Sequence, residues 1–119
     1  MSDGRHLILD MYGCSKVVLD DRQLLVQALE SALRMAKANV LQIISNKFEP
    51  QGVTVLALLA ESHASIHTWP EIGYCAIDLY TCGEETDTHA AAQYLKNRLA
   101  AENVEEKELV RSITPSNCV

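Results

Sequence analysis

One short stretch of the sequence concentrates residue types that could do chemistry. Residues 61–71 read Glu-Ser-His-Ala-Ser-Ile-His-Thr-Trp-Pro-Glu and directly follow residues 53–60, the most apolar segment of the chain. A continuous apolar run with β-branched residues is typical of a strand buried on both faces. The polar residues after such a strand would lie at an edge of a sheet. Hydrogen-bonded polar side chains at a strand end are also common without any function, and this is the structural alternative.

Three kinds of chemistry use these residue types. A serine hydrolase would need a positioned acid and, typically, glycines around the nucleophile, but Ser62 lies between Glu61 and His63. A metal site would need His63 and His67 close together, and in a strand they share a face about 13 Å apart. The third chemistry is self-cleavage, in which a serine side chain attacks the carbonyl of the preceding residue while a nearby histidine moves protons.

The same residues resemble a known family. The motif Glu61-Ser62-His63 is followed by residues 66–71 (Ile-His-Thr-Trp-Pro-Glu) and by Tyr80-Thr81-Cys82-Gly83. This set looks like the small bacterial and archaeal S-adenosylmethionine decarboxylases, and at this spacing it is highly specific. Residues 4–7 and 47–53 extend the resemblance, which covers residues 4–100 without an evident gap.

The resemblance implies a precursor that makes its own cofactor. Ser62 matches the family's processing site, so its Oγ would attack the Glu61 carbonyl, and elimination and hydrolysis would leave a pyruvoyl group. The cut would divide the single domain, residues 1–119, into fragment 1–61 (the β chain), which stays bound, and fragment 62–119 (the pyruvoyl-bearing α chain). The pyruvoyl group would form a Schiff base with the substrate amine and accept electrons as carbon dioxide leaves. The implied product supplies aminopropyl groups for spermidine biosynthesis.

Three further residues match the family's reaction chemistry. His67 matches the histidine that assists processing, and Cys82 matches the proton donor to the substrate. Thr54 stands where the family usually has a serine whose hydroxyl is used in processing. Thr54 keeps a hydroxyl, but it also raises the hypothesis of a homologue that neither processes nor catalyses. Cys75 is expected to be an ordinary buried residue in the middle of a strand.

A second group of residues is expected to bind the substrate. By resemblance, Phe48 stacks on the adenine of S-adenosylmethionine and Glu71 holds its ribose hydroxyls. Trp69, the only tryptophan, is expected near the site or at a dimer seam. Val55 and Asn46 replace a glycine and a histidine of the family, and a glycine in a strand often marks a close approach of another group. These replacements motivate a related activity on arginine or ornithine as the alternative.

Composition excludes several other functions. The chain has 119 residues with 10 Lys plus Arg and 16 Asp plus Glu, a net charge of −6, which argues against nucleic acid binding. No apolar run reaches membrane-spanning length and no signal peptide is visible, so we expect a cytoplasmic protein without a membrane partner. The four cysteines form no CxxC pair, so we expect reduced thiols and no metal site.

Hydrophobic periodicity predicts the elements that position these residues. Two helices are expected, from Asp20 or Asp21 to about Asn39 and from Asp87 or Thr88 onward. The expected strands are residues 6–12, 40–48, 53–60 (with 65–69 continuing the sheet), 74–81 and 105–113, before a loose tail at 114–119. The order β-α-β-β-β-α-β predicts an α+β, two-layer sandwich of a mainly antiparallel sheet and two helices. Two helices can cover only one face, so we expect at least a homodimer with the site near its seam.

Overall fold

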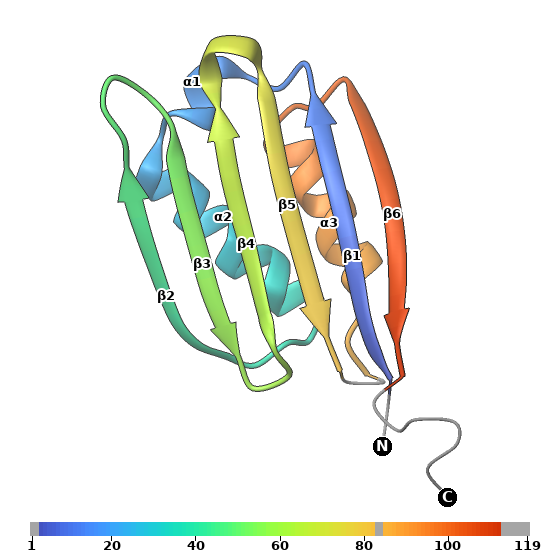
Figure 1. Cartoon of the computed structure of the whole chain (residues 1–119). Helices are drawn as coiled ribbons and strands as arrows, with labels where there is room; N and C mark the ends of the chain where they lie inside the picture. Colours follow the sequence, from blue (N-terminus) through green and yellow to red (C-terminus); the bar gives the residue numbers. More distant parts are fainter. Residues whose placement is uncertain (1–2, 83–84, 113–119) are drawn as a thin grey trace, which may run out of the picture.

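The computed structural model describes residues 3–82 and 85–112 and has two layers (Figure 1). Its sheet has the strand order β2-β3-β4-β5-β1-β6, and each neighbouring pair is antiparallel. The strands are β1 (Gly4–Tyr12), β2 (Val40–Lys47), β3 (Val53–Leu59), β4 (His63–Trp69), β5 (Tyr74–Thr81) and β6 (Asn103–Arg111). The helices are α1 (Lys16–Leu19), α2 (Arg22–Met35), α3 (Thr88–Arg98) and the 3-10 turn η1 (Pro70–Ile72). The expected α+β sandwich is confirmed.

Helices α2 and α3 form the second layer and cover one face of the sheet (Figure 1). Each begins at an aspartate: the Asp21 side chain accepts a hydrogen bond from the Leu24 amide, and the Asp87 side chain accepts one from Ala90, both at 3.1 Å. The buried stripe of α2 has the predicted helical spacing and consists of Leu25, Ala28, Leu29, Ala32 and Leu33. None of the helices in the described ranges combines the length and apolar character needed to cross a bilayer.

Helix α2 ends earlier than its periodicity predicted. Its last residue is Met35 rather than Asn39, because Lys37 adopts a left-handed conformation with φ of 63°. The Ala38 amide then donates to the Leu33 carbonyl at 3.0 Å and closes the helix end. Glycine usually occupies such a position, so a lysine there gives no signal in the sequence.

The sheet has one strand more than the predicted order. Residues 63–69 form the complete strand β4, whereas the sequence predicted only that 65–69 continue the sheet. Strand β6 begins at Asn103 rather than at residue 105. The expected loose tail lies outside the described residues.

The other face of the sheet, here called the open face, is not covered by any element of the described chain. Leu56 and Leu58 of β3 are 41% and 52% exposed there. The expectation of a third strand buried on both faces is therefore wrong for the single chain. Because side chains alternate along a strand, Val55 points the other way and is fully buried in the core. The Val55 side chain thus packs in the core and does not narrow a pocket on the open face.

Candidate active site

Ser62 lies in the tight turn that joins β3 to β4. The Leu59 amide donates to the Ser62 carbonyl at 2.9 Å, so only Ala60 and Glu61 form the tip of the hairpin. The Ser62 Oγ lies 3.1 Å from Nδ1 of His63, within hydrogen-bonding distance. Ser62 is half-buried and His63 is exposed on the open face. The serine expected to attack its own chain is thus at an accessible turn, beside an imidazole.

Asn39 holds the tip of this hairpin. Its backbone amide and its side-chain Nδ2 donate to the two carboxylate oxygens of Glu61, at 3.0 and 2.7 Å. Its carbonyl accepts from the Ala60 amide at 2.9 Å. Partial burial favours a raised pKa for the Glu61 carboxyl, but the hydrogen bonds from Asn39 and from its own backbone outweigh it and lower the pKa. Two hydrogen bonds therefore hold the side chain of Glu61, the residue whose carbonyl would be attacked, and a third holds the preceding residue Ala60.

Cys82 lies at the same end of the sheet as Ser62. His63 is opposite Tyr80 in the register of β4 and β5, with ring centroids 5.5 Å apart. Continuing this register by one residue places Ser62 beside the end of β5, where Cys82 follows as a half-buried residue. Cys75 lies in the middle of β5 and is fully buried, and burial raises the pKa of its thiol well above the ordinary value. The expectation of a buried Cys75 in the middle of a strand is confirmed.

A pocket of about 320 Å³ opens at the opposite end of β4. Within it, Thr54 Oγ1 of β3 and His67 Nδ1 of β4 lie 3.0 Å apart. The two residues are direct partners in the strand register, and Asn46 of β2 is the next partner across the sheet. The lining residues are Phe48, Gln51, Gly52, Thr54, His67, Thr68, Trp69 and Glu71. The Thr54–His67 pair thus lines this pocket, and Asn46 is the next residue across the sheet from Thr54.

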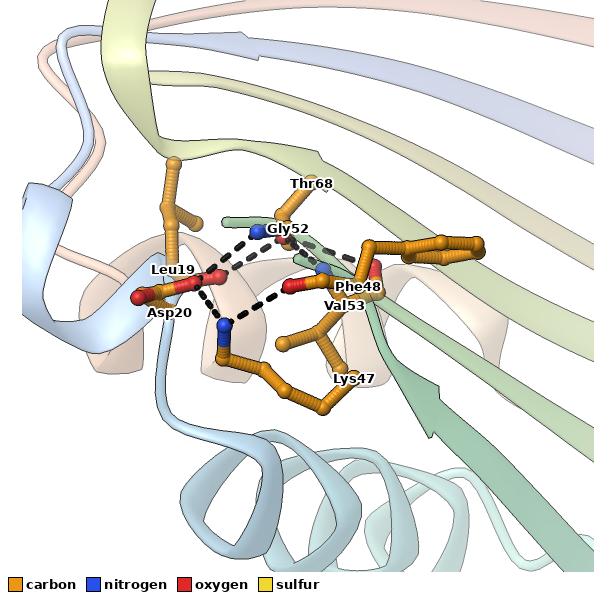
Figure 2. Close-up of polar contacts among 7 residues, drawn as sticks. All are labelled: Leu19, Asp20, Lys47, Phe48, Gly52, Val53 and Thr68. Atoms are coloured by element: carbon orange, nitrogen blue, oxygen red, sulfur yellow. Dashed lines mark hydrogen bonds and ion pairs between the residues drawn. The ribbon is translucent and has the colours of Figure 1, made fainter. Parts of the chain in front are cut away.

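The expected substrate-binding residues surround the same pocket. Phe48 projects from the turn after β2, is 48% exposed, and is free to offer a ring face (Figure 2). Trp69 ends β4 and packs against Tyr74, with ring centroids 5.2 Å apart. Glu71 follows in η1, where it is exposed. The structure therefore brings together the aromatic residues and the carboxylate that the sequence assigned to binding.

The two ends of β4 are separate within one chain. Ser62 precedes β4 and His67 lies five residues later, which corresponds to about 16 Å along an extended strand. The imidazole within reach of Ser62 in the same chain is that of His63. Ser62 and Cys82 thus form one group, and Thr54, His67 and the pocket residues form another.

Over β2 and β3 the open face is apolar, whereas β4 presents His63, Ser65 and His67 on it. A depression of about 310 Å³ lies over β2, β3 and the start of β4, and its apolar walls include Ile44, Leu56 and Leu58. Over residues 3–82 and 85–112, no group of three or more His, Cys, Asp or Glu side chains could hold a metal ion.

Sequence reasoning missed three residues that contact the candidate site. His63 belongs to the recognised motif but had no assigned role, although it contacts Ser62. Asn39 was expected at the end of a helix, and Asp20 as a possible helix cap. Asp20 instead accepts a hydrogen bond from the Gly52 amide at 2.9 Å. Only the fold brings the Asn39 and Asp20 side chains to their partners, which lie 22 and 32 residues away in sequence.

Comparisons with known proteins agree over nearly the whole chain. The model of the S-adenosylmethionine decarboxylase family matches residues 5–112. The S-adenosylmethionine decarboxylase proenzymes of Synechococcus sp. (strain WH7803) and Caldicellulosiruptor saccharolyticus are 49% and 44% identical to it, over 95% and 92% of this chain and 88% and 89% of theirs. The crystal structure of the adenosylmethionine decarboxylase from Aquifex aeolicus VF5 matches with a TM-score of 0.89 and 32% identity, over 98% of this chain and 96% of that one. The chain therefore belongs to the S-adenosylmethionine decarboxylase family.

Proposed function

We propose that the protein is a proenzyme that cuts itself between Glu61 and Ser62 and then decarboxylates S-adenosylmethionine. The observation that carries this proposal is the pocket at the end of β4, which combines the Phe48 ring, the Glu71 carboxylate and the Thr54–His67 pair. The substrate presents a flat adenine, a ribose diol and an α-amino acid. An aromatic face, a pair of carboxylate oxygens and a proton-transfer group suit those three parts.

Self-cleavage requires a nucleophile, an ordered carbonyl and proton transfer. Ser62 Oγ attacks the Glu61 carbonyl carbon, the peptide C–N bond breaks, and an ester forms. The Ser62 α-proton is then lost, and the bond between Ser62 Oγ and its Cβ breaks. This elimination leaves the Glu61 carboxylate and a dehydroalanine at position 62. Water then replaces nitrogen, ammonia leaves, and a pyruvoyl group begins fragment 62–119. The hairpin supports the first step, because Asn39 donates two hydrogen bonds to Glu61 and accepts one from Ala60.

A second copy of the chain completes this site. His67 cannot reach Ser62 of its own chain along an extended strand of about 16 Å. A twofold axis that lies between two facing sheets, perpendicular to their strands, reverses strand direction in the partner. The Ser62 end of one β4 then meets the His67 end of the other, and two identical sites result.

The apolar part of the open face supports this homodimer. Ile44, Leu56 and Leu58 are 55%, 41% and 52% exposed in the single chain. A monomer rarely exposes such a cluster, and burial contributes about 25 cal/mol per Å² of apolar surface. The sequence of β3 is that of a strand buried on both faces, and a facing copy would bury its second face. Trp69, also on the open face, would then lie near the seam.

The residues of both ends have distinct tasks in decarboxylation. The pyruvoyl group supplies an electron sink when present. Phe48 stacks on the adenine, and Glu71 accepts hydrogen bonds from the diol. Cys82 lies beside the new N-terminus and donates the proton to the substrate α-carbon. Burial keeps Cys75 protonated in the core, away from the reaction.

The product would feed spermidine synthesis, and the expected compartment is the cytoplasm. Cys14, Cys75 and Cys82 are free thiols, which suits a reducing compartment. Arginine and ornithine have neither a flat base nor a diol, so Phe48 and Glu71 would have no partner on them. The burial of Val55 also removes one of the two reasons for that alternative.

The test combines a measurement of the fragment masses with an assay of decarboxylation. Purified protein is expected to consist of fragments 1–61 and 62–119, and to release labelled carbon dioxide from S-adenosylmethionine but not from arginine or ornithine. Ser62→Ala is expected to stay one inactive chain. An uncut wild-type chain that still decarboxylates would refute the mechanism. A cut chain that acts only on arginine or ornithine would refute the substrate.

A further inference from the structure

The turn that carries Phe48 is tied to the distant segment between α1 and α2. Asp20 Oδ1 accepts a hydrogen bond from the Gly52 amide at 2.9 Å and lies 3.0 Å from the Lys47 ammonium (Figure 2). Lys47 Nζ also donates to the carbonyl of Phe48 at 3.0 Å. One carboxylate oxygen thus contacts both ends of the turn.

A second contact fixes the neighbouring strand. Thr68 Oγ1 donates to the Leu19 carbonyl at 2.7 Å and accepts from the Val53 amide at 2.9 Å (Figure 2). Thr68 is buried and lies directly between His67 and Trp69. The segment of residues 19–20 therefore holds the chain on both sides of the pocket.

The backbone conformation of the turn requires a glycine at position 52. Gly52 has φ of 109°, and a Cβ there would lie 3.3 Å from the Thr68 carbonyl oxygen, so only glycine suits the position. Its carbonyl accepts from the Phe48 amide at 2.8 Å and closes the turn. Glycine is also the most flexible residue, so an external acceptor on its amide restricts the turn.

We infer that Asp20 is a positioning residue that fixes the turn of residues 48–52, so that the Phe48 ring is held ready for adenine. This inference rests on the proposed function. Phe48 is 48% exposed, so packing contributes little to its orientation, and the turn beneath it must be ordered by polar contacts. The adjacent Asp21 has a different task, because its side chain caps α2 through the Leu24 amide.

Asp21 therefore provides a matched control for Asp20. Asp20→Ala and Asp21→Ala each remove a carboxylate, from adjacent positions, but only Asp20→Ala releases the turn. Asp20→Ala is expected to raise KM for S-adenosylmethionine roughly tenfold, which corresponds to a lost charged hydrogen bond. Its kcat and its cleavage at Glu61–Ser62 are expected to stay near wild type. Asp21→Ala is expected to lower the melting temperature while leaving KM unchanged.

A double-mutant comparison tests whether Asp20 acts through the ring. In a Phe48→Ala background, Asp20→Ala is expected to change KM less than twofold, because no ring remains to be positioned. The same tenfold rise in both backgrounds would overturn the inference. So would a wild-type KM in Asp20→Ala itself.

Hydrogen exchange tests the clamp without turnover. The Gly52 amide is expected to exchange roughly tenfold faster in Asp20→Ala than in wild type or Asp21→Ala. An unchanged exchange rate would overturn the inference even in an active enzyme. If wild type instead releases no carbon dioxide from S-adenosylmethionine, the proposed function fails, and Gly52 exchange still decides whether Asp20 holds the turn.

Discussion

The two ends of β4 carry different groups, but similar hydrogen bonds order the loops at both. At the Ser62 end, Asn39 holds the Glu61 side chain and the tip of a hairpin. At the His67 end, Asp20 holds the turn that carries Phe48. In each case the connection before or after α2 reaches a loop of the sheet. One helix therefore organises both ends, while the sheet keeps them apart.

The difference teaches how one strand can serve two sites. The Ser62 end presents a peptide bond and the Cys82 thiol, and the His67 end presents the pocket and a second imidazole. Because each end lacks what the other has, a site would need two copies of the chain. Mutations at one end should therefore affect cleavage, and mutations at the other should affect binding, except where both ends meet.

The largest expected effect is that two inactive variants restore cleavage when they are combined. Ser62→Ala and His67→Ala are each expected to remain uncut and inactive alone. Mixed dimers would pair the intact Ser62 of one chain with the intact His67 of the other and restore one site. Mass spectrometry after coexpression is expected to show that only the His67→Ala chain is cut. Efficient cleavage of His67→Ala alone would instead favour His63, the imidazole already 3.1 Å from Ser62.

The next largest effect is expected from Cys82, which follows β5, with Cys75 in the middle of β5 as its control. Cys82→Ala is expected to cut itself normally but to lose roughly 100-fold in turnover, the usual scale for a lost proton donor. More of its pyruvoyl group should be lost to faulty protonation, as intact mass would reveal. Cys75→Ala is expected to retain activity and to lose about 1 kcal/mol of stability from a small cavity. Equal losses in turnover would exclude Cys82 as the donor.

A smaller effect is expected from Asn39. Asn39→Ala removes the Nδ2 hydrogen bond to Glu61 and leaves the two backbone hydrogen bonds of residue 39 in place. Cleavage should therefore slow about threefold while KM of the cut enzyme stays unchanged. The rate is followed by denaturing gel after synthesis of the chain. Asn97→Ala is a suitable control, because Asn97 is an exposed partner of Gln93 on α3. A rise in KM without slower cleavage would contradict the separation of the two ends.

The smallest expected effect is a pH-dependent loss of stability at the same contact. The pKa of Glu61 is lowered in the folded chain from an ordinary value of 4.5. Its contribution is thus present above that value and lost as the pH falls through the folded pKa. In uncut Ser62→Ala protein, Asn39→Ala should lower stability by about 0.5 kcal/mol at pH 7, and by less at a pH below 4.5. Thermal melts at both pH values provide the measurement, and an equal difference at both would contradict it.

Much of the fold could be predicted because it depends on local periodicity. The helical spacing of Leu25, Leu29 and Leu33 predicted the buried face of α2, and alternation predicted β5 around its buried Ile77. The end of α2 could not be predicted, because a lysine, and not the usual glycine, adopts the left-handed conformation there. Strand β4 was partly hidden because His63, Ser65 and His67 are polar residues on an open face.

The candidate site was predictable as a set of residues but not as an arrangement. The motif named Ser62 and His67, and only the pairing of β3 with β4 shows that they lie at opposite ends of a strand. Asp20 and Asp21 illustrate the same limit. Their sequence context is that of two equivalent helix caps, but their partners are 32 and 3 residues away.

The strand order has a consequence for a molecule that has been cut. Fragment 1–61 would contribute β1, β2 and β3, and fragment 62–119 would contribute β4, β5 and β6. Since β1 lies between β5 and β6, three of the five ladders (β3–β4, β5–β1 and β1–β6) join the two fragments. The fragments are interleaved, so neither can leave without dismantling the sheet. Unfolding of a cut subunit is also a dissociation, and refolding would require an encounter of two chains, so its yield should fall on dilution.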